Sequence, residues 1–276
     1  MKTSTQLKAL VRNLSKEKNV EAEIILRNFM LERLLERISI SDYRNNFILK
    51  GGMLIAAIVG IDTRTTMDLD ATIKAQILNE AEVTTIIDDI LSVPVDDNVI
   101  FTFKSVEEIH EEADYPGYRV SIEAVLDKTR QVLKVDITTG DFVTPREVQY
   151  YFKLMFEDRT ISIMAYNLET VLAEKFETVI TRGITNTRMR DLYDIYILTA
   201  TQPLDTNTFC AALKKTTEKR HTAAQMTDPE DVIRTIADSD IMVDLWKRYQ
   251  KKYSYAADIT WEIAMDALKG LNDRAK

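Results

Sequence analysis

Residues 50–74, KGGMLIAAIVGIDTRTTMDLDATIK, contain the pattern that decides the fold. Two adjacent glycines, Gly51 and Gly52, precede an apolar run, and two aspartates, Asp68 and Asp70, follow it with one leucine between them. Side chains two residues apart on a β-strand point to the same face of the sheet. The pattern therefore predicts a half-buried strand that presents both carboxylates together.

Two carboxylates held close together need something that compensates their charge. At about 4 Å they repel by about 4 kcal/mol if the effective dielectric constant is about 20. A shared proton, a basic partner or a divalent cation would each offset this cost. Mg²⁺ suits hard oxygen ligands in a half-open cleft, and we expect it as the cofactor.

The segment LKVDITT, residues 133–139, supplies a third carboxylate. Its apolar residues alternate with polar ones, among them Asp136, so it is predicted to be a strand with one polar face. If this strand lies beside residues 67–73, Asp136 points toward the other two carboxylates. Three carboxylates on neighbouring strands can hold two metals for in-line phosphoryl transfer. We expect Asp136 and one metal to activate the attacking oxygen, while the other metal holds the departing pyrophosphate.

The two glycines lie between a short apolar strand and the apolar run, which is predicted to be a buried helix. Backbone amides at such a helix start carry partial positive charge and suit a triphosphate, and glycine lets a phosphate approach closely. Taken singly, these features have ordinary explanations: a Gly-Gly turn, a solvent-facing strand and a surface aspartate. Their order along the chain is much more specific than any one of them.

Bulk composition limits the class of protein. The chain has 276 residues, of which 45% are hydrophobic and 29% charged, enough for a real core. A net charge of −8 argues against a surface coated in positive charge for non-specific nucleic-acid binding. The single cysteine, Cys210, excludes an internal disulfide and leads us to expect a reducing, cytoplasmic location. One cysteine and two histidines argue against a zinc site, and we expect no membrane span.

Periodicity predicts an α+β part followed by an all-helical part. Before residue 100, helices are expected over residues 4–18, 20–38, 53–59 and 79–92, and strands in NFILKGG and TMDLDATI. The charges of the second helix are expected opposite its apolar stripe. Five strand-like runs follow, and Asn167 is expected to cap the first of several helices. The expected domains are residues 1–165, α+β, and residues 166–276, helical.

Four blocks of the sequence together resemble a known family. They are LKGGMLIAAIVGIDTRTTMDLD, with Arg64 and Thr66 before the aspartate pair, LKVDI around Asp136, ETVLAEKFETVITR with Lys175, and TRMRDLYDIYIL with Asp191. In this order, over roughly residues 20–200, the chain resembles the AbiEii/AbiGii-type toxins of abortive-infection toxin–antitoxin systems. These toxins are part of the polymerase-β-like nucleotidyltransferase superfamily. A departure is Met53, which stands where a small hydroxyl residue is common.

The resemblance implies a polymerase-β-like core with a mixed sheet, and an enzyme that uses an NTP and Mg²⁺ to transfer a nucleotide. The acceptor is expected to be RNA, a tRNA 3′ end for some relatives, and a cognate antitoxin protein is expected as partner in phage defence. By the same resemblance, the residues expected to hold metal are Asp68, Asp70 and Asp136. The expected NTP contacts are Gly51, Gly52, Arg64, Thr66 and Lys175, and Asp191 is expected to be a further catalytic residue.

Without the resemblance, the helical half gives weaker signals. Lys175 lies at the border of an apolar stripe, and spacing alone favours a lysine that reaches solvent over a phosphate ligand. Asp191 and Asp194, with the nearby arginines, would form an ion network on a helix surface. The segment WKRYQKKY, residues 246–253, could grip an RNA backbone and stack on bases, although a solvated amphipathic helix is the commoner meaning.

Two alternatives to RNA modification remain open. A small-molecule nucleotidyltransferase, such as one that modifies an antibiotic, would use the same carboxylates. A protein that binds a nucleotide or its antitoxin without chemistry would instead tolerate their substitution. We expect a monomer, because the sequence has no long exposed apolar stripe.

Overall fold

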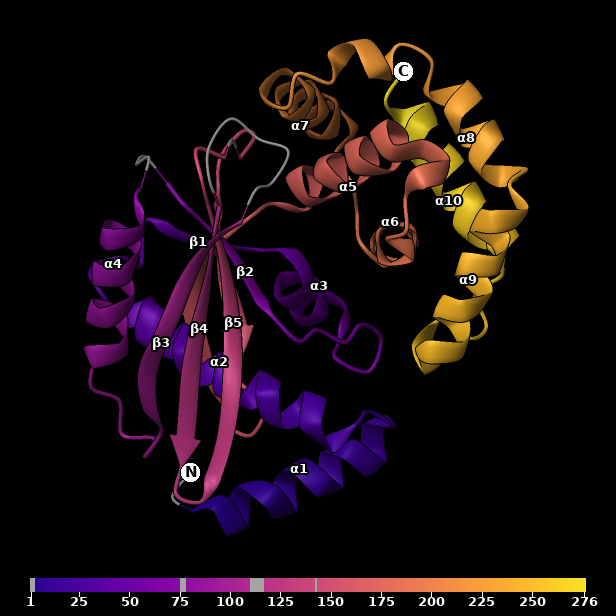
Figure 1. The fold of residues 1–276 in the computed structure, drawn as a ribbon. Helices are drawn as coiled ribbons and strands as arrows, with labels where there is room; N and C mark the ends of the chain where they lie inside the picture. Colours follow the sequence, from indigo (N-terminus) through magenta and orange to yellow (C-terminus); the bar gives the residue numbers. More distant parts are fainter. Residues whose placement is uncertain (1–2, 75–77, 110–116, 142) are drawn as a thin grey trace. The chain divides into compact units, whose positions relative to one another are not determined.

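A mixed β-sheet organises the first of two compact units in the computed structural model, which describes residues 3–74, 78–109, 117–141 and 143–276 (Figure 1). The first unit comprises Met1–Asp141 with Glu147–Tyr166, and the second comprises Phe142–Arg146 with Asn167–Lys276. Within the described ranges the sheet has the order β3-β4-β5-β2-β1-β7-β6. Its strands are β1 Phe47–Lys50, β2 Leu69–Ile73, β3 Ile100–Ile109, β4 Gly117–Leu126, β5 Thr129–Thr139, β6 Val148–Lys153 and β7 Thr160–Ala165.

The sheet combines parallel and antiparallel pairs. β2 runs parallel to β5 and β1 runs parallel to β7, whereas β1–β2, β3–β4, β4–β5 and β6–β7 are antiparallel. The expected α+β class with a mixed sheet is confirmed. The β2–β5 pair, on which the third carboxylate depends, sets Asp70 opposite Asp136.

Among the residues described, the helices of this unit are α1 Ser4–Lys18, α2 Ala22–Ile40, α3 Gly51–Val59 and α4 Glu80–Ser92. α2 lies across one face of the sheet and contacts β5 and β7, while α4 packs on β3 (Figure 1). The alternation along β4 shows the two faces of the sheet. Val120 and Ile122 are fully buried, whereas Arg119 and Ser121, which alternate with them, are half-buried. One face of the sheet is therefore apolar and covered, and the other carries polar side chains.

Two boundaries in the decisive stretch differ from the sequence prediction. α3 begins at Gly51 and not at residue 53, because Gly51 has a φ of 63° that lets the chain turn directly from β1 into the helix. β2 begins at Leu69, so that Asp68 precedes the strand. The Thr66 hydroxyl donates to the carbonyl oxygen of Asp68 at 3.1 Å and holds the chain in a turn there.

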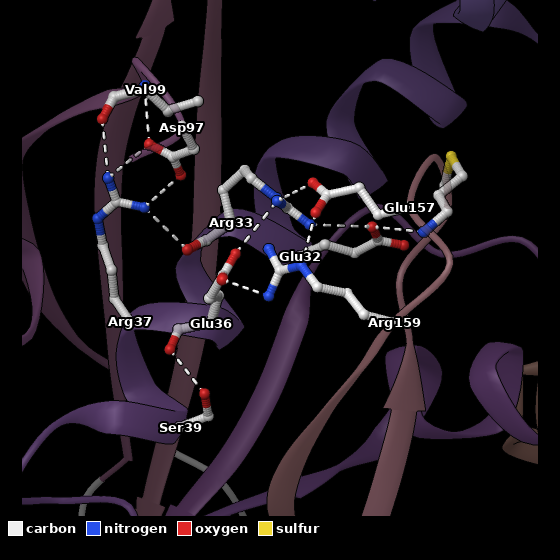
Figure 2. A network of polar contacts seen from close by, with 10 residues as sticks. Glu32, Arg33, Glu36, Arg37, Ser39, Asp97, Val99, Glu157 and Arg159 are labelled. Carbon is white, nitrogen blue, oxygen red and sulfur yellow. Dashed lines mark hydrogen bonds and ion pairs between the residues drawn. The ribbon is translucent and has the colours of Figure 1, made fainter. Parts of the chain in front are cut away.

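The charged residues in the second half of α2, Glu32, Arg33, Glu36 and Arg37, are buried, contrary to the prediction that the charges face away from the core, whereas Glu23 near its start is exposed. Figure 2 shows Arg33 and Arg37 pointing from α2 into ion pairs with two segments of the unit. Arg37 donates to both carboxylate oxygens of Asp97, at 2.7 and 3.0 Å, and Arg33 donates to Glu157 at 2.7 Å. The backbone amide of Met155 donates to Glu32 at 2.9 Å. This network fastens the segments before β3 and between β6 and β7 to the helix.

The second unit is helical in the residues described. Its helices are α5 Leu168–Arg182, α6 Met189–Thr201, α7 Thr206–Lys219, α8 Pro229–Ala237, α9 Asp240–Lys252 and α10 Trp261–Arg274. Asn167 caps α5 as predicted, because its side chain accepts from the amide of Thr170 at 2.8 Å. Among the described residues, no helix combines the length and the apolar character that a membrane span requires.

Aromatic rings form much of the core of this unit. Trp246 and Tyr249 are 1% and 8% exposed and stack with ring centroids 5.5 Å apart, and Tyr193 lies 6.1 Å from Tyr249. Two rings of the segment that could have stacked on bases are thus core residues. The basic residues of the same segment, such as Lys247 and Lys251, remain exposed.

Candidate active site

Four polar residues stand in one row across four neighbouring strands. Arg119 on β4 lies opposite Asp136 on β5, Asp136 lies opposite Asp70 on β2, and Asp70 lies opposite Lys50 on β1. Register partners present their side chains on the same face. The sheet therefore brings Asp70 and Asp136 together, with a cationic residue on each side.

The Gly-Gly turn is built around Asp70. The backbone amide of Gly52 donates to an oxygen of Asp70 at 3.1 Å. A Cβ atom on Gly51 would lie 2.1 Å from the same oxygen, and one on Gly52 would lie 2.7 Å from the Thr66 hydroxyl. The backbone can therefore approach the Asp70 carboxylate and the Thr66 hydroxyl this closely only because both positions are glycine. The Gly52 amide that we expected to face a phosphate has Asp70 as its partner.

Asp68 experiences an excess of negative charge. Burial raises the pKa of its carboxyl, and the neighbouring Asp70 and Asp136 raise it further, against the opposing effects of Lys134 and Arg119. Binding of a proton or a cation therefore lowers the electrostatic free energy of this carboxyl. Asp68 thus lies where a bound cation would offset its neighbours' negative charge.

Asp136 has an arginine partner that the sequence reading missed. Arg119 donates from Nε to Oδ1 at 2.8 Å and from Nη2 to Oδ2 at 2.7 Å. This pair raises the pKa of the guanidinium, through the hydrogen bonds first and the charge of Asp136 second. The available signal was the alternating segment YRVSIEAVL, whose polar face includes Arg119. Strand order is needed to place that face beside Asp136.

Arg64 and Thr66 hold the turn before β2. Arg64 is 2% exposed and donates to the carbonyl oxygen of Thr65, next to it in the chain. The side chain of Asn28 on α2 donates to the carbonyl oxygen of Thr66 at 2.9 Å. Both residues thus support the backbone next to Gly52. Their contact with a nucleotide stays a prediction.

Lys175 lies between two carboxylates in the second unit. Its Nζ atom is 2.8 Å from Asp191 and 2.7 Å from Asp194, and the Asp194 side chain is 0% exposed. The lysine is therefore held inside the unit, which differs from the solvent-reaching lysine that spacing alone favoured. Arg190 donates to the hydroxyl of Tyr253 at 3.0 Å, and Lys175 is the ion-pair partner of both Asp191 and Asp194.

The residues present fit a divalent cation in part. Asp68 and Asp70 supply hard oxygen ligands with excess negative charge. Both oxygens of Asp136 accept from Arg119. Across the described ranges, no three His, Cys, Asp or Glu side chains are grouped so as to hold a metal ion. The binding of Mg²⁺ by Asp68 and Asp70, and the part of Asp136 in it, stay predictions.

A family model described as "Nucleotidyl transferase AbiEii toxin, Type IV TA system" matches residues 33–267. This chain belongs to the AbiEii family. The resemblance noted in the sequence is thereby confirmed. Membership of the AbiEii family supports a nucleotidyltransferase of a toxin–antitoxin system, with an NTP as substrate and an antitoxin as partner.

Solved structures show the same fold as this AbiEii chain at low sequence identity. A protein from H. pylori described as a "putative nucleotidyltransferase" has a TM-score of 0.55 and 14% identity, over 93% of this chain and 96% of that one. JHP933 from Helicobacter pylori has a TM-score of 0.53 and 12% identity, over 92% and 93% of the two chains. No curated protein matches the sequence. The likeness to these structures supports the fold of a nucleotidyltransferase.

Proposed function

We propose that this chain is a toxin that transfers a nucleotide from an NTP to RNA, with tRNA as the acceptor and Mg²⁺ as the cofactor. The main support is the pair Asp68 and Asp70, placed after a glycine turn and beside Asp136 in a chain of the AbiEii family. We further propose that it acts as a monomer in the cytoplasm, in defence against phage. The single cysteine fits a reducing compartment.

Transfer of a nucleotide is one in-line displacement. The acceptor hydroxyl attacks the α-phosphorus, the bond from that phosphorus to the oxygen of the β-phosphate breaks, and pyrophosphate leaves while the hydroxyl proton passes to water. Mg²⁺ supplies neutralisation of the charge that develops on the phosphate oxygens. Asp68 and Asp70 would hold this ion, and the hydrogen bond from Gly52 fixes the orientation of Asp70.

Lys175 is proposed to contact the triphosphate. Its pairing with the buried Asp194 fixes the position of the ammonium group, and Asp191 forms a second ion pair with it. An ammonium group that is already ordered loses less entropy when it binds a phosphate. Asp191 is proposed to position the lysine.

Exposed basic residues of α9 are the proposed contacts to the RNA backbone. Lys247, Arg248, Lys251 and Lys252 are all exposed. Burial alone would raise the pKa of Tyr253, but the neighbouring Arg190 and Lys252 lower it, which indicates a positive local potential. Such a surface favours phosphate groups.

Growth arrest and labelling test this function. On expression, the parent is expected to arrest growth, and Asp68→Ala and Lys175→Ala are expected to relieve the arrest. Labelled NTP is expected to enter total RNA only with the parent protein. Label in a small molecule but not in RNA would favour the antibiotic-type alternative. Arrest that persists in both variants would favour an inhibitor that performs no chemistry.

A further inference from the structure

The pairing of Arg119 with Asp136 changes what the third carboxylate can do. The two residues are register partners on β4 and β5, and two parallel N–H donors of the guanidinium meet the two carboxylate oxygens at 2.8 and 2.7 Å. Charge-assisted pairs with this fork geometry are among the stronger hydrogen-bonded contacts in proteins. The Asp136 side chain is only 15% exposed, which leaves little room for another partner.

The charges of the row support a site for one divalent cation. Lys50, at the other end of the row, lies 2.8 Å from Asp141, so its charge is matched by that carboxylate. Arg119 matches the charge of Asp136. Asp68 and Asp70 remain, and a single divalent cation suits these two carboxylates.

We propose that Arg119 is a positioning residue that retains Asp136 as an arginine-bound carboxylate and confines cation binding to Asp68 and Asp70. The protein alone then binds one divalent cation and not two. This inference rests on the proposed function, because it concerns the cation of the same site. It differs from the three-carboxylate arrangement that the sequence suggested.

Mn²⁺ binding to the full chain, followed by the loss of the free-ion signal in electron paramagnetic resonance, tests this role. The parent is expected to bind one Mn²⁺, and Asp70→Asn is expected to lower the affinity by about tenfold or more. Asp136→Asn is expected to keep one Mn²⁺ and to lose less affinity than Asp70→Asn does, because it removes a nearby negative charge but not a ligand. Arg119→Met is expected to gain a second Mn²⁺ or to tighten the first by about tenfold, because it removes a nearby positive charge and releases a carboxylate.

Two further variants make the result specific. The double variant Arg119→Met/Asp136→Asn is expected to return to one Mn²⁺, since the released carboxylate is then gone. Arg130→Met is the matched control, because Arg130 is 67% exposed on the same strand as Asp136, about 20 Å along it. It removes the same charge and is expected to bind Mn²⁺ as the parent does. Thermal unfolding of each variant shows which ones are folded.

Several results would overturn the role of Arg119. They are an Asp136→Asn variant that loses Mn²⁺ as severely as Asp70→Asn, a folded Arg119→Met that binds as the parent does, and a parent that binds no Mn²⁺. Failure of the proposed function is distinguishable. If the expected Mn²⁺ pattern occurs but no nucleotide is transferred, the cation site stands and the transferase activity does not.

Discussion

The Nζ atom of Lys175 lies 2.7 Å from a carboxylate oxygen of Asp194, whose side chain is fully buried. A second carboxylate, Asp191, lies 2.8 Å from the same atom. Breaking a buried ion pair by removing one partner leaves a charge without compensation. The residue proposed to contact the triphosphate is therefore also part of what stabilises the second unit.

Substitution of Lys175 should affect stability and activity separately. Lys175→Met is expected to lower the free energy of unfolding by about 3 kcal/mol, because it removes one partner of an ion pair with the buried Asp194. The double variant Lys175→Met/Asp194→Asn is expected to regain most of this loss, yet to remain inactive in nucleotide transfer. Urea unfolding and the RNA-labelling assay measure the two effects. Equal instability of the single and double variants would argue against the pair as a stabilising contact.

Gly51 should tolerate no side chain. Gly51→Ala places a Cβ atom 2.1 Å from the Asp70 carboxylate at a φ of 63°, so we expect a loss of about 2 kcal/mol or more and weaker Mn²⁺ binding. Gly270 on α10 is the matched control, because nothing lies within 4 Å of a Cβ atom there. Gly270→Ala is expected to stabilise the chain by about 0.5–1 kcal/mol. If Gly51→Ala unfolds at the same urea concentration as the parent, the claim that Asp70 leaves no room for a side chain at Gly51 is wrong.

Glu32 should make stability depend on pH. Its pKa is raised from 4.5 to about 8, mainly by burial, with the hydrogen bond from Met155 opposing the shift. The folded chain therefore holds this proton more tightly than the unfolded chain does. The stabilising contribution is complete below about pH 4.5 and is lost as the pH rises through about 8.

The variant Glu32→Gln isolates this contribution, because glutamine keeps an oxygen to accept from the Met155 amide. Between pH 5 and pH 8, the parent should lose up to about 1.4 kcal/mol per pH unit relative to Glu32→Gln. Urea unfolding of both proteins at several pH values measures the difference. A difference that stays constant with pH would contradict the raised pKa.

Asp141 should depend on its cation more than on its neutral partners. Its carboxylate accepts from Lys50 at 2.8 Å, from the Tyr166 hydroxyl at 2.9 Å and from the Thr138 hydroxyl. Tyr166→Phe removes one neutral hydrogen bond and is expected to cost about 1 kcal/mol. Lys50→Met removes the ammonium group from a carboxylate that is 10% exposed and is expected to cost about 3 kcal/mol. Thermal unfolding gives the order, and a larger loss in Tyr166→Phe would contradict this account.

Local patterns predicted most of the elements. The helix expected over residues 4–18 is α1, and the predicted cap at Asn167 begins α5. These features depend on neighbours in the sequence, such as a side-chain oxygen two or three residues before an amide. The polar faces that present Asp70 and Asp136 were also accessible, because alternation fixes the face of each residue, whereas the pairing of their strands was only assumed.

Contacts between distant segments were not accessible in the same way. Arg119 meets Asp136 only because β4 lies beside β5 on the side away from β2. Arg33 and Arg37 are buried because partners arrive from other segments, such as Asp97 and Glu157. Helical periodicity places a charged residue on a face but does not say whether another charged group covers that face.

Sequencing of tRNA 3′ ends after incubation with each NTP and Mg²⁺ tests nucleotide transfer most directly. The parent is expected to extend the ends with at least one NTP, and Asp70→Asn is expected to extend none. Asp266→Asn serves as the control, because its side chain is 75% exposed on α10, and it is expected to act as the parent does. Unchanged ends with all four NTPs, or extension by Asp70→Asn equal to that of the parent, would contradict transfer to tRNA by this carboxylate cluster.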